Sequence, residues 1–333
     1  MGRRLFPLVV VIIAFVLAPG LRGYLKFGVQ VGDRMVGLQW TRQPIRYAVT
    51  SRDVTGVSAA QLQTAVAHAF AEWDRPANVA IASQFQGFTT AEPFNDDATS
   101  VIGFRSRPEL DRTLGATTFV IDDTTGEILE ADIFLNSAFT WSVAANGEAN
   151  KFDVESVVVH EMGHFLGLGH SALGETELRS GGGRTVLGKR AVMFPIAYPA
   201  GSIADRTLQA DDVSGITDIY GDATAQRDLG AIQGRVTLNG AGVFGAHVTA
   251  FNPATGELVS GFTLTDQGEF VIGALTPGRY IVRVEPLDDA DVDGFFESDT
   301  PVNINFQVAY YSRQVAVPAG GAGPAIAIKV KSK

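Results

Sequence analysis

The sequence predicts an α+β domain followed by an all-β sandwich, on three observations. The chain is 333 residues long, more than one hydrophobic core usually serves, so two domains are expected. Up to about residue 221, segments with helical spacing of apolar residues alternate with short strands. From residue 230 onward, only short alternating strands and glycine turns follow, as in a β-sandwich. We therefore expect one domain at 24–225 and a second at 228–333.

The first 23 residues are typical of an export signal. Arg3 and Arg4 precede an uncharged, strongly apolar run over 5–21. Small residues at Ala18 and Gly20 would suit a cleavage site, but Pro19 between them disfavours cleavage. Residues 1–23 are thus either a signal peptide or an uncleaved signal anchor. Both place the rest of the chain outside the cytoplasm, secreted or tethered, with membrane contact only through this segment.

Composition excludes several classes of function. The formal net charge of −10 leaves no basic stripe to neutralise phosphates, so nucleic acid is not expected as a partner. The absence of cysteine excludes disulfides, thiolate metal ligands and cysteine nucleophiles. A hydrophobic content of 46% with 19% charged residues is that of a globular protein.

The first elements of the α+β domain are a strand at 44–49 and a long helix. Ser58 caps this helix, with Gln61 as its capping-box partner. One face of the helix is apolar and should lie on a core; its residues are Leu62, Val66, Phe70 and Trp73. His68 in the same helix is interpreted as a packing or surface residue.

Further strands and helices follow up to residue 221. Strands are expected at 101–104, 115–121 and 128–135, the last two joined by a hairpin turn. Asp153 caps a helix over 154–166. The polar, glycine-containing stretch 174–190 predicts a flexible loop, and 191–195 a compact apolar turn. Residues 208–221 predict a capped helix that ends at a glycine.

The most informative string in the chain is HEMGHFLGLGH at 160–170, the pattern H-E-x-x-H-x-x-G-x-x-H. His160 and His164 lie one helical turn apart, so both imidazoles can bind one ion. Gly167 can adopt a left-handed conformation that returns His170 to the same ion. Three imidazoles on Zn²⁺ leave a fourth position for water, as in catalytic sites. Glu161 stands beside the first ligand, where it can accept that water's proton as general base.

The alternative for this string is a buried amphipathic helix whose histidines are merely hydrogen-bonded. The chain has five histidines, and three of them fall inside the string. The other two, His68 and His247, stand alone in a predicted helix and a predicted strand, where packing or surface roles are more common. This concentration favours the zinc site.

Four segments resemble the matrixins, the matrix-metalloprotease-like branch of the metzincins, over roughly 32–221. They are VVHEMGHFLGLGHS at 158–171, VMFP at 192–195, QADDVSGI at 209–216 and IYG at 219–221. The resemblance implies the metzincin fold, a twisted mixed sheet with helices. It also implies His160, His164 and His170 as zinc ligands and Glu161 as the catalytic base.

The same resemblance implies roles beyond the zinc ligands. Met193 would form the hydrophobic base beneath the zinc, and Pro195, Ile196 and Tyr198 would wall the specificity pocket. Calcium sites are implied by the family, without assigned ligands. Pro195 occupies the place of the tyrosine ligand of astacins and serralysins.

Other departures from the family concern latency, metals and specificity. Without cysteine, the cysteine-switch mode of latency is impossible. The histidine-rich second zinc site of vertebrate matrixins has no counterpart, which leaves one zinc. The connection from His170 to Met193 is longer than in vertebrate matrixins, so substrate preference is expected to differ.

The C-terminal part is similar to carboxypeptidase-regulatory or transthyretin-like β-sandwich modules. The likeness lies in GRV at 234–236, GAHV at 245–248, TDQGEF at 265–270 and LTPGRY at 275–280. These are turn and core positions, which predict fold rather than function. Within this part, DADVDG at 289–294 resembles the start of a calcium loop, but position twelve is Thr300 instead of glutamate. A solvated acidic loop is therefore favoured.

Together, motif and resemblance imply a zinc-dependent metalloendopeptidase that hydrolyses peptide bonds of extracytoplasmic proteins. Its substrates would be proteins or peptides, bound in extended form along an edge strand at 114–118, and the protein would be a monomer. One alternative is a catalytically silent adhesion or matrix-binding protein in which zinc only stabilises the fold. Another is a zinc hydrolase of non-peptide amides; deformylases share H-E-x-x-H but need a cysteine ligand, which this chain lacks.

Overall fold

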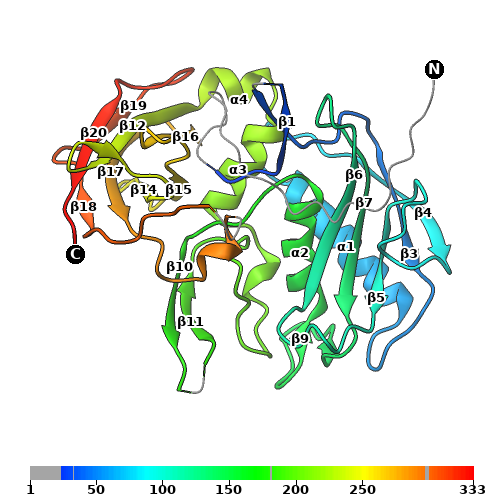
Figure 1. Cartoon of the computed structure of the whole chain (residues 1–333). Coiled ribbons are helices and arrows are strands. Elements are labelled where there is room, and N and C mark those ends of the chain that lie inside the picture. The colour runs from blue at the N-terminus through cyan, green and yellow to red at the C-terminus, as the bar shows by residue number, and fades with distance from the viewer. Residues whose placement is uncertain (1–23, 33, 181, 297–299) are drawn as a thin grey trace.

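The computed structural model describes residues 24–32, 34–180, 182–296 and 300–333. It places a mixed α/β part beside a β-rich part (Figure 1). The predicted signal at 1–23 lies outside the described residues. In the described ranges, no helix is long and apolar enough to span a bilayer.

A mixed five-stranded sheet forms the N-terminal part, in the order β4-β3-β5-β7-β6. Its strands are β3 (Ile45–Thr50), β4 (Ser83–Thr89), β5 (Val101–Arg105), β6 (Gly115–Ile121) and β7 (Ile128–Asn136). The first four in that order run parallel, whereas β6 is antiparallel to β7 and forms the edge. The strands predicted at 44–49, 101–104, 115–121 and 128–135 are thus confirmed within a residue or so.

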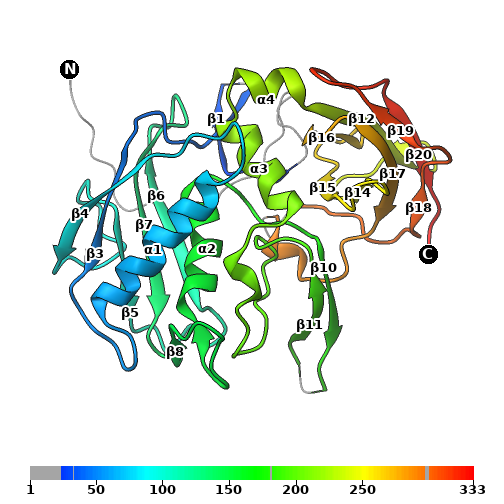
Figure 2. The same ribbon diagram turned by 180° about the vertical axis from the view of Figure 1, so that it is seen from behind.

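Helices α1 (Ala59–Asp74) and α2 (Val154–Phe165) cover one face of this sheet (Figure 2). Ser58 and Gln61 form the predicted capping box at the start of α1. The predicted apolar face of α1 is buried against the core; its residues are Leu62, Val66, Phe70 and Trp73. Trp73 also donates a hydrogen bond from Nε1 to the carbonyl of Val159, 2.8 Å away, which ties α1 to α2. His68 lies on the surface near Glu155.

The prediction of a flexible loop at 174–190 is wrong. The segment forms a hairpin of β10 (Gly174–Leu178) and β11 (Arg184–Lys189), which extends from the molecule in Figure 1. Val186 is buried, and the backbone amide of Thr176 is hydrogen-bonded to Asp289 of the C-terminal part. These tertiary contacts stabilise strands that the polar, glycine-rich sequence does not reveal.

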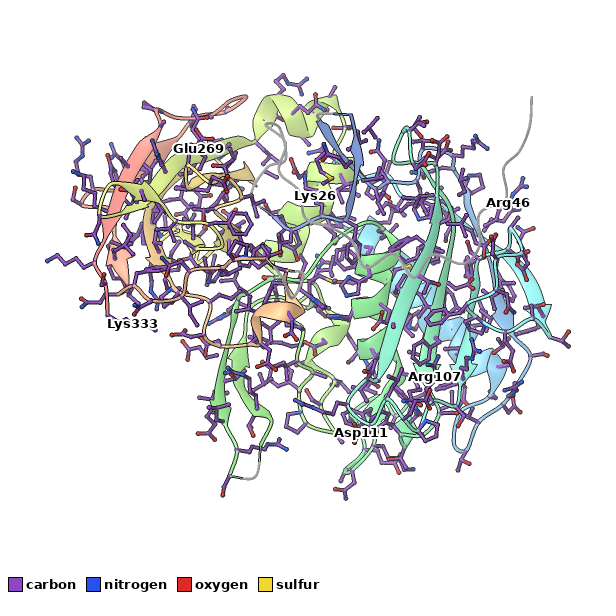
Figure 3. All side chains as sticks on the ribbon, viewed as in Figure 1. Lys26, Arg46, Arg107, Asp111, Glu269 and Lys333 are labelled. Carbon is purple, nitrogen blue, oxygen red and sulfur yellow. The ribbon has the colours of Figure 1, made fainter. Side chains whose placement is uncertain are left out.

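Short elements complete the N-terminal part. Two-stranded ribbons pair β1 (Gly28–Val31) with β2 (Arg34–Gly37) and β8 (Trp141–Ser142) with β9 (Phe152–Asp153). The 3₁₀ turn η1 spans Ala204–Arg206. The helix predicted at 208–221 is α3 (Ala210–Tyr220), and in it Asp218 pairs with Lys26, labelled in Figure 3. Helix α4 (Ala223–Asp228) occupies the segment where the sequence suggests a domain boundary; the boundary itself stays a prediction.

The C-terminal part is the predicted β-sandwich. One sheet has the order β13-β12-β16, with β20 also paired to β12, and the other the order β15-β14-β17-β18, with β19 on β17. The elements are β12 (Gly230–Leu238), β13 (Ala241–Gly242), β14 (His247–Phe251), β15 (Leu258–Phe262), β16 (Glu269–Leu275), β17 (Gly278–Glu285), η2 (Val292–Gly294), β18 (Ala309–Tyr310), β19 (Val315–Val317) and β20 (Ile326–Val330). His247 is buried beside Glu285, so its predicted packing role is confirmed.

The sandwich packs directly against the N-terminal part. Ser214 Oγ of α3 donates to the carbonyl of Gly273, 2.8 Å away, and the amide of Ser260 donates to Asp211. A separate apolar cluster takes residues from both parts; its largest members are Phe194, Phe262, Phe295 and Phe296. This shared cluster brings part of the sandwich close to the histidines of the 160–170 motif.

Candidate metal centre

Helix α2 and the turn after it position the three motif histidines. Asp153 caps α2 by accepting a hydrogen bond from the amide of Ser156 at 2.8 Å. Beyond the helix, Gly167 has φ of 101°. A Cβ there would lie 2.4 Å from the carbonyl oxygen of Leu38, so both conformation and space require glycine. The predicted turn brings His170 back to the helix.

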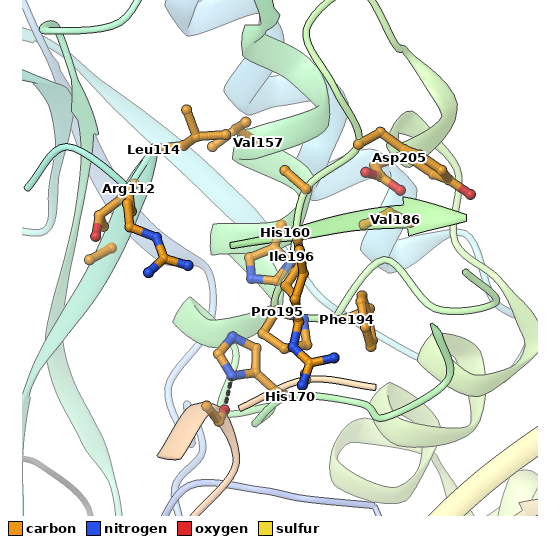
Figure 4. A pocket seen from close by; sticks show the side chains of 18 of the residues that line it. Arg112, Leu114, Val157, His160, His170, Val186, Phe194, Pro195, Ile196 and Asp205 are labelled. Atoms are coloured by element: carbon orange, nitrogen blue, oxygen red, sulfur yellow. Dashed lines mark hydrogen bonds between the residues drawn. The ribbon is translucent and has the colours of Figure 1, made fainter. Parts of the chain in front are cut away.

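The ring nitrogens of the three histidines converge within 4.8 Å of one another. In each ring Nδ1 contacts a backbone carbonyl; the partners are Val192 for His160 at 2.8 Å, Leu168 for His164 at 2.8 Å and Gly294 for His170 at 2.5 Å, the last drawn in Figure 4. Because a carbonyl only accepts, each Nδ1 carries the proton and each neutral Nε2 keeps its lone pair.

The inward-facing nitrogens create a site for a cation. Nε2 of His164 and Nε2 of His170 lie 3.1 Å apart, and two lone pairs at that separation repel unless a cation lies between them. Burial, then the neighbouring His164, lowers the pKa of His160 well below its ordinary value. Burial also lowers the pKa of His164 to about 3 and that of His170 to about 4. Neutral imidazoles in this geometry fit Zn²⁺, which takes unprotonated histidine nitrogens.

Glu161 is held beside the histidines by the edge strand β6. Its carboxylate is buried, and Oε2 accepts a hydrogen bond from Thr117 Oγ at 2.9 Å. Gly115 leaves room for it, because a Cβ at that position would lie 3.0 Å from Glu161 Oε1. Burial raises the pKa of Glu161 to about 7, against the opposing hydrogen bond from Thr117. A carboxyl with a pKa near neutrality suits proton transfer at physiological pH.

The apolar turn with Met193 lies against α2. A Cβ on Gly163 would come within 2.3 Å of Met193 Sδ, so the helix accommodates the methionine through a glycine. Asp212 of α3 fixes the turn by accepting hydrogen bonds from the amides of Val192 and Met193, at 2.8 and 3.1 Å. The sequence places Asp212 in a family-like helix but gives no sign of this contact with the turn.

A cleft of about 1190 Å³ runs past the histidines (Figure 4). The predicted pocket residues Pro195, Ile196 and Tyr198 all line it, as does the segment 114–117 on the side of β6. Also in the lining, Lys189 Nζ pairs with Asp205 Oδ2 at 2.7 Å, and both side chains are largely buried.

The C-terminal sandwich also reaches the cleft, which the sequence does not predict. Gly294, Phe295 and Phe296 are among the lining residues. Gly294 contributes only its backbone carbonyl to His170, a residue 124 positions away in the chain. A main-chain contact at that separation leaves no side-chain signal in the sequence.

Two family models match the chain. The matrixin model matches residues 39–179, and the carboxypeptidase regulatory-like domain model matches residues 231–308. The chain therefore contains a matrixin domain and a carboxypeptidase regulatory-like domain over these residues, as the resemblances in its sequence imply.

Plant metalloendoproteinases are among the similar curated proteins. Metalloendoproteinase 1-MMP of Arabidopsis thaliana is 27% identical over 192 residues, covering 55% of this chain and 44% of that protein. Metalloendoproteinase 1 of Glycine max is 32% identical over 171 residues, covering 48% of this chain and 45% of that protein. Metalloendoproteinase 4-MMP of Arabidopsis thaliana is 36% identical over 91 residues, covering 27% of this chain and 22% of that protein. The chain thus spans less than half the length of these relatives.

Proposed function

We propose that the protein is a zinc-dependent metalloendopeptidase acting on proteins outside the cytoplasm. The observation that carries this proposal is the arrangement of three neutral histidines, with their Nε2 atoms converging, beside one buried carboxylate, Glu161. The matrixin domain and the relatives named metalloendoproteinases support it.

Each site residue has a defined task in this proposal. His160, His164 and His170 would hold a single zinc ion, which would polarise the scissile carbonyl and acidify the attacking water. Thr117 holds Oε2 of Glu161, and the other carboxylate oxygen, Oε1, takes the proton of that water. Glu161 then delivers the proton to the leaving amine.

The substrate is proposed to bind in extended form along β6. This strand pairs with β7 on one side only and lines the cleft through 114–117. An added peptide strand can therefore form main-chain hydrogen bonds there. Pro195, Ile196 and Tyr198 would wall the pocket for one substrate side chain, and the β10–β11 hairpin, which the cleft also touches, would shape its rim.

The location outside the cytoplasm rests on the sequence of residues 1–23. Two arginines followed by an uncharged apolar run suit export, whether the segment is cleaved or kept as an anchor. Secreted or tethered, the site would meet extracytoplasmic proteins.

A catalytically silent, zinc-stapled adhesion protein is the second candidate. A structural zinc site has four protein ligands, whereas this one offers three histidines and a carboxylate placed for proton transfer. The geometry therefore favours hydrolysis.

The test is hydrolysis of casein and of a peptide library by the purified protein, together with metal analysis. We expect one zinc per chain, cleavage that stops when zinc is removed by a chelator, and recovery when zinc is returned. A zinc-loaded protein that cleaves no peptide in the library would contradict the proposal and favour the silent alternative. If the protein cleaves only small non-peptide amides, the alternative of a zinc hydrolase of non-peptide amides is favoured.

A further inference from the structure

A loop of the C-terminal sandwich lies on the metal centre. It follows β17, and its described residues 288–296, here called the cleft loop, include the short turn η2 (Figure 1). The carbonyl of Gly294 accepts a hydrogen bond from His170 Nδ1 at 2.5 Å. The ring of Phe295 lies beside the same histidine, with 6.2 Å between ring centroids.

We propose that the cleft loop forms part of the metal centre and that Gly294 is a positioning residue, whose carbonyl orients the ring of His170. The inference rests on the proposed zinc site and deepens it. His160 and His164 find their carbonyl partners, Val192 and Leu168, within the N-terminal part. Among the described residues, the carbonyl partner of His170 is Gly294 of the sandwich. A carbonyl on the outer nitrogen fixes both the tautomer and the ring orientation of a metal-binding histidine.

Polar contacts hold the cleft loop on the β10–β11 hairpin. Thr176 of β10 donates from its amide to Asp289 Oδ1 at 3.1 Å and from its hydroxyl to the Asp289 carbonyl at 2.5 Å. Arg184 of β11 donates from Nη1 to the carbonyl of Asp288 at 3.0 Å. The hairpin thus presents donors to the backbone of the loop, and the loop is fixed at its start.

Apolar packing holds the other end of the cleft loop. Phe295 and Phe296 are 3% and 2% exposed. Phe295 packs on Phe262 of β15, with ring centroids 5.7 Å apart. Their cluster also includes Phe194, the residue after Met193. Because this small core takes side chains from both domains, the Gly294 carbonyl is held in place relative to α2.

The sandwich is therefore more than a separable attachment to the peptidase domain. With the cleft loop displaced, His170 would lose the acceptor that orients its ring, while His160 and His164 would keep theirs. Loss of an outer partner of a metal ligand costs about 10–100-fold in metal affinity.

The test uses the full-length protein with the double substitution Asp289→Ala and Phe295→Ala, which removes one side-chain contact at the start of the loop and the apolar contact at its other end. The control is Phe306→Ala, because Phe306 is equally buried but lies in the sandwich core away from the loop. Zinc affinity is measured by competition with a chromophoric chelator, and site geometry by the visible absorption of the cobalt-substituted protein. Circular dichroism checks that each variant is folded.

We expect the double variant to bind zinc about 10–100-fold more weakly and to show a changed cobalt spectrum. Phe306→Ala should keep the wild-type affinity and spectrum. A folded double variant with wild-type affinity and spectrum would overturn the inference. If the double variant does not fold, Thr176→Val takes its place; it removes the hydroxyl that donates to the Asp289 carbonyl and accepts from Arg184 Nη1. Weakened zinc affinity that Thr176→Ser restores supports the inference, and unchanged affinity overturns it.

The same preparation separates this inference from the proposed function. A wild-type protein that binds zinc and cleaves casein, with loop variants that bind zinc equally well, would defeat only the role of the cleft loop. A wild-type protein that binds no zinc would defeat the proposed function itself, and the loop's role with it.

Discussion

The carboxylate of Asp212 accepts a hydrogen bond from the backbone amide of Met193, so helix α3 fixes the turn that lies against α2. The same carboxylate accepts a hydrogen bond from the amide of Val192. The carbonyl of Val192 in turn accepts a hydrogen bond from Nδ1 of His160. A buried side chain from a later helix is thereby linked, through one residue, to the first histidine of the site.

Replacing Asp212 should destabilise the fold strongly. Asp212→Ala leaves the two buried amides of Val192 and Met193 and the part-buried amide of Gln209 without their acceptor. We expect the free energy of unfolding of the metal-free protein to fall by about 3 kcal/mol or more, measured by urea denaturation. Asp222→Ala is the control; it removes a helix-capping carboxylate at α4, with an expected loss of about 1 kcal/mol. Equal losses would show that Asp212 is an ordinary cap.

Adding one methyl group at Gly163 should disturb the methionine turn. The new Cβ would lie 2.3 Å from Met193 Sδ and 2.7 Å from Trp73 Cζ2, and the indole ring has little freedom to move. Overpacking costs about 1–3 kcal/mol, more than the helix propensity that alanine adds. The melting temperature of Gly163→Ala should therefore fall. Gly188→Ala, where nothing lies within 4 Å, should leave it unchanged; a melting temperature of Gly163→Ala at or above wild type would contradict this packing.

Thr117 should support turnover through Glu161. Thr117→Val keeps the shape of the side chain but removes the hydroxyl that bonds Glu161 Oε2. A hydrogen bond to a charged group is worth about 1.5–3 kcal/mol, so kcat should fall by about tenfold or more. KM and zinc content should stay unchanged, since the backbone of β6 is intact. Thr117→Ser should recover most of the turnover; a serine variant as slow as the valine variant would exclude the hydroxyl as the cause.

Glu130 should make stability depend on pH. Burial, then the nearby Asp132, raises the pKa of this buried carboxyl from 4.5 to about 7. The pKa of Glu130 in the folded protein is thus above its value in the unfolded chain. Its contribution to folding stability is therefore full below about pH 4.5 and is lost as pH rises through about 7. Glu130→Gln cannot ionise, so relative to wild type it should gain stability between pH 5 and 8, as measured by urea denaturation.

The control for Glu130 is Glu177→Gln, on the exposed hairpin. Its stability relative to wild type should not change over the same pH interval. A Glu130→Gln protein whose difference from wild type is the same at both pH values would contradict the assigned shift.

Local sequence signals predicted most of the N-terminal fold and the histidine triad. The capping box of Ser58 and Gln61, and the return of His170 through Gly167, depend on residues close in sequence. Their physical causes are backbone hydrogen bonds and a left-handed glycine, both readable from the residues alone.

The contacts that were missed join distant segments. The polar residues of 174–190 predict a loop, yet Thr176 of this hairpin is fixed by Asp289, 113 positions away. The carbonyl of Gly294 belongs to the backbone, so no residue type reveals it. Asp212 is visible in the sequence, but its acceptor role depends on how α3 docks against the methionine turn.

The most direct measurement of the central claim is kcat/KM for peptide hydrolysis by Glu161→Gln, with zinc stoichiometry determined on the same sample. Glutamine keeps the size of the side chain and the hydrogen bond from Thr117 but cannot take a proton. The account predicts one zinc per chain, as in wild type, and a fall in kcat/KM of about 10²–10⁴-fold, the contribution of a general base. Wild-type kcat/KM with zinc still bound would contradict the assignment of Glu161 as the base.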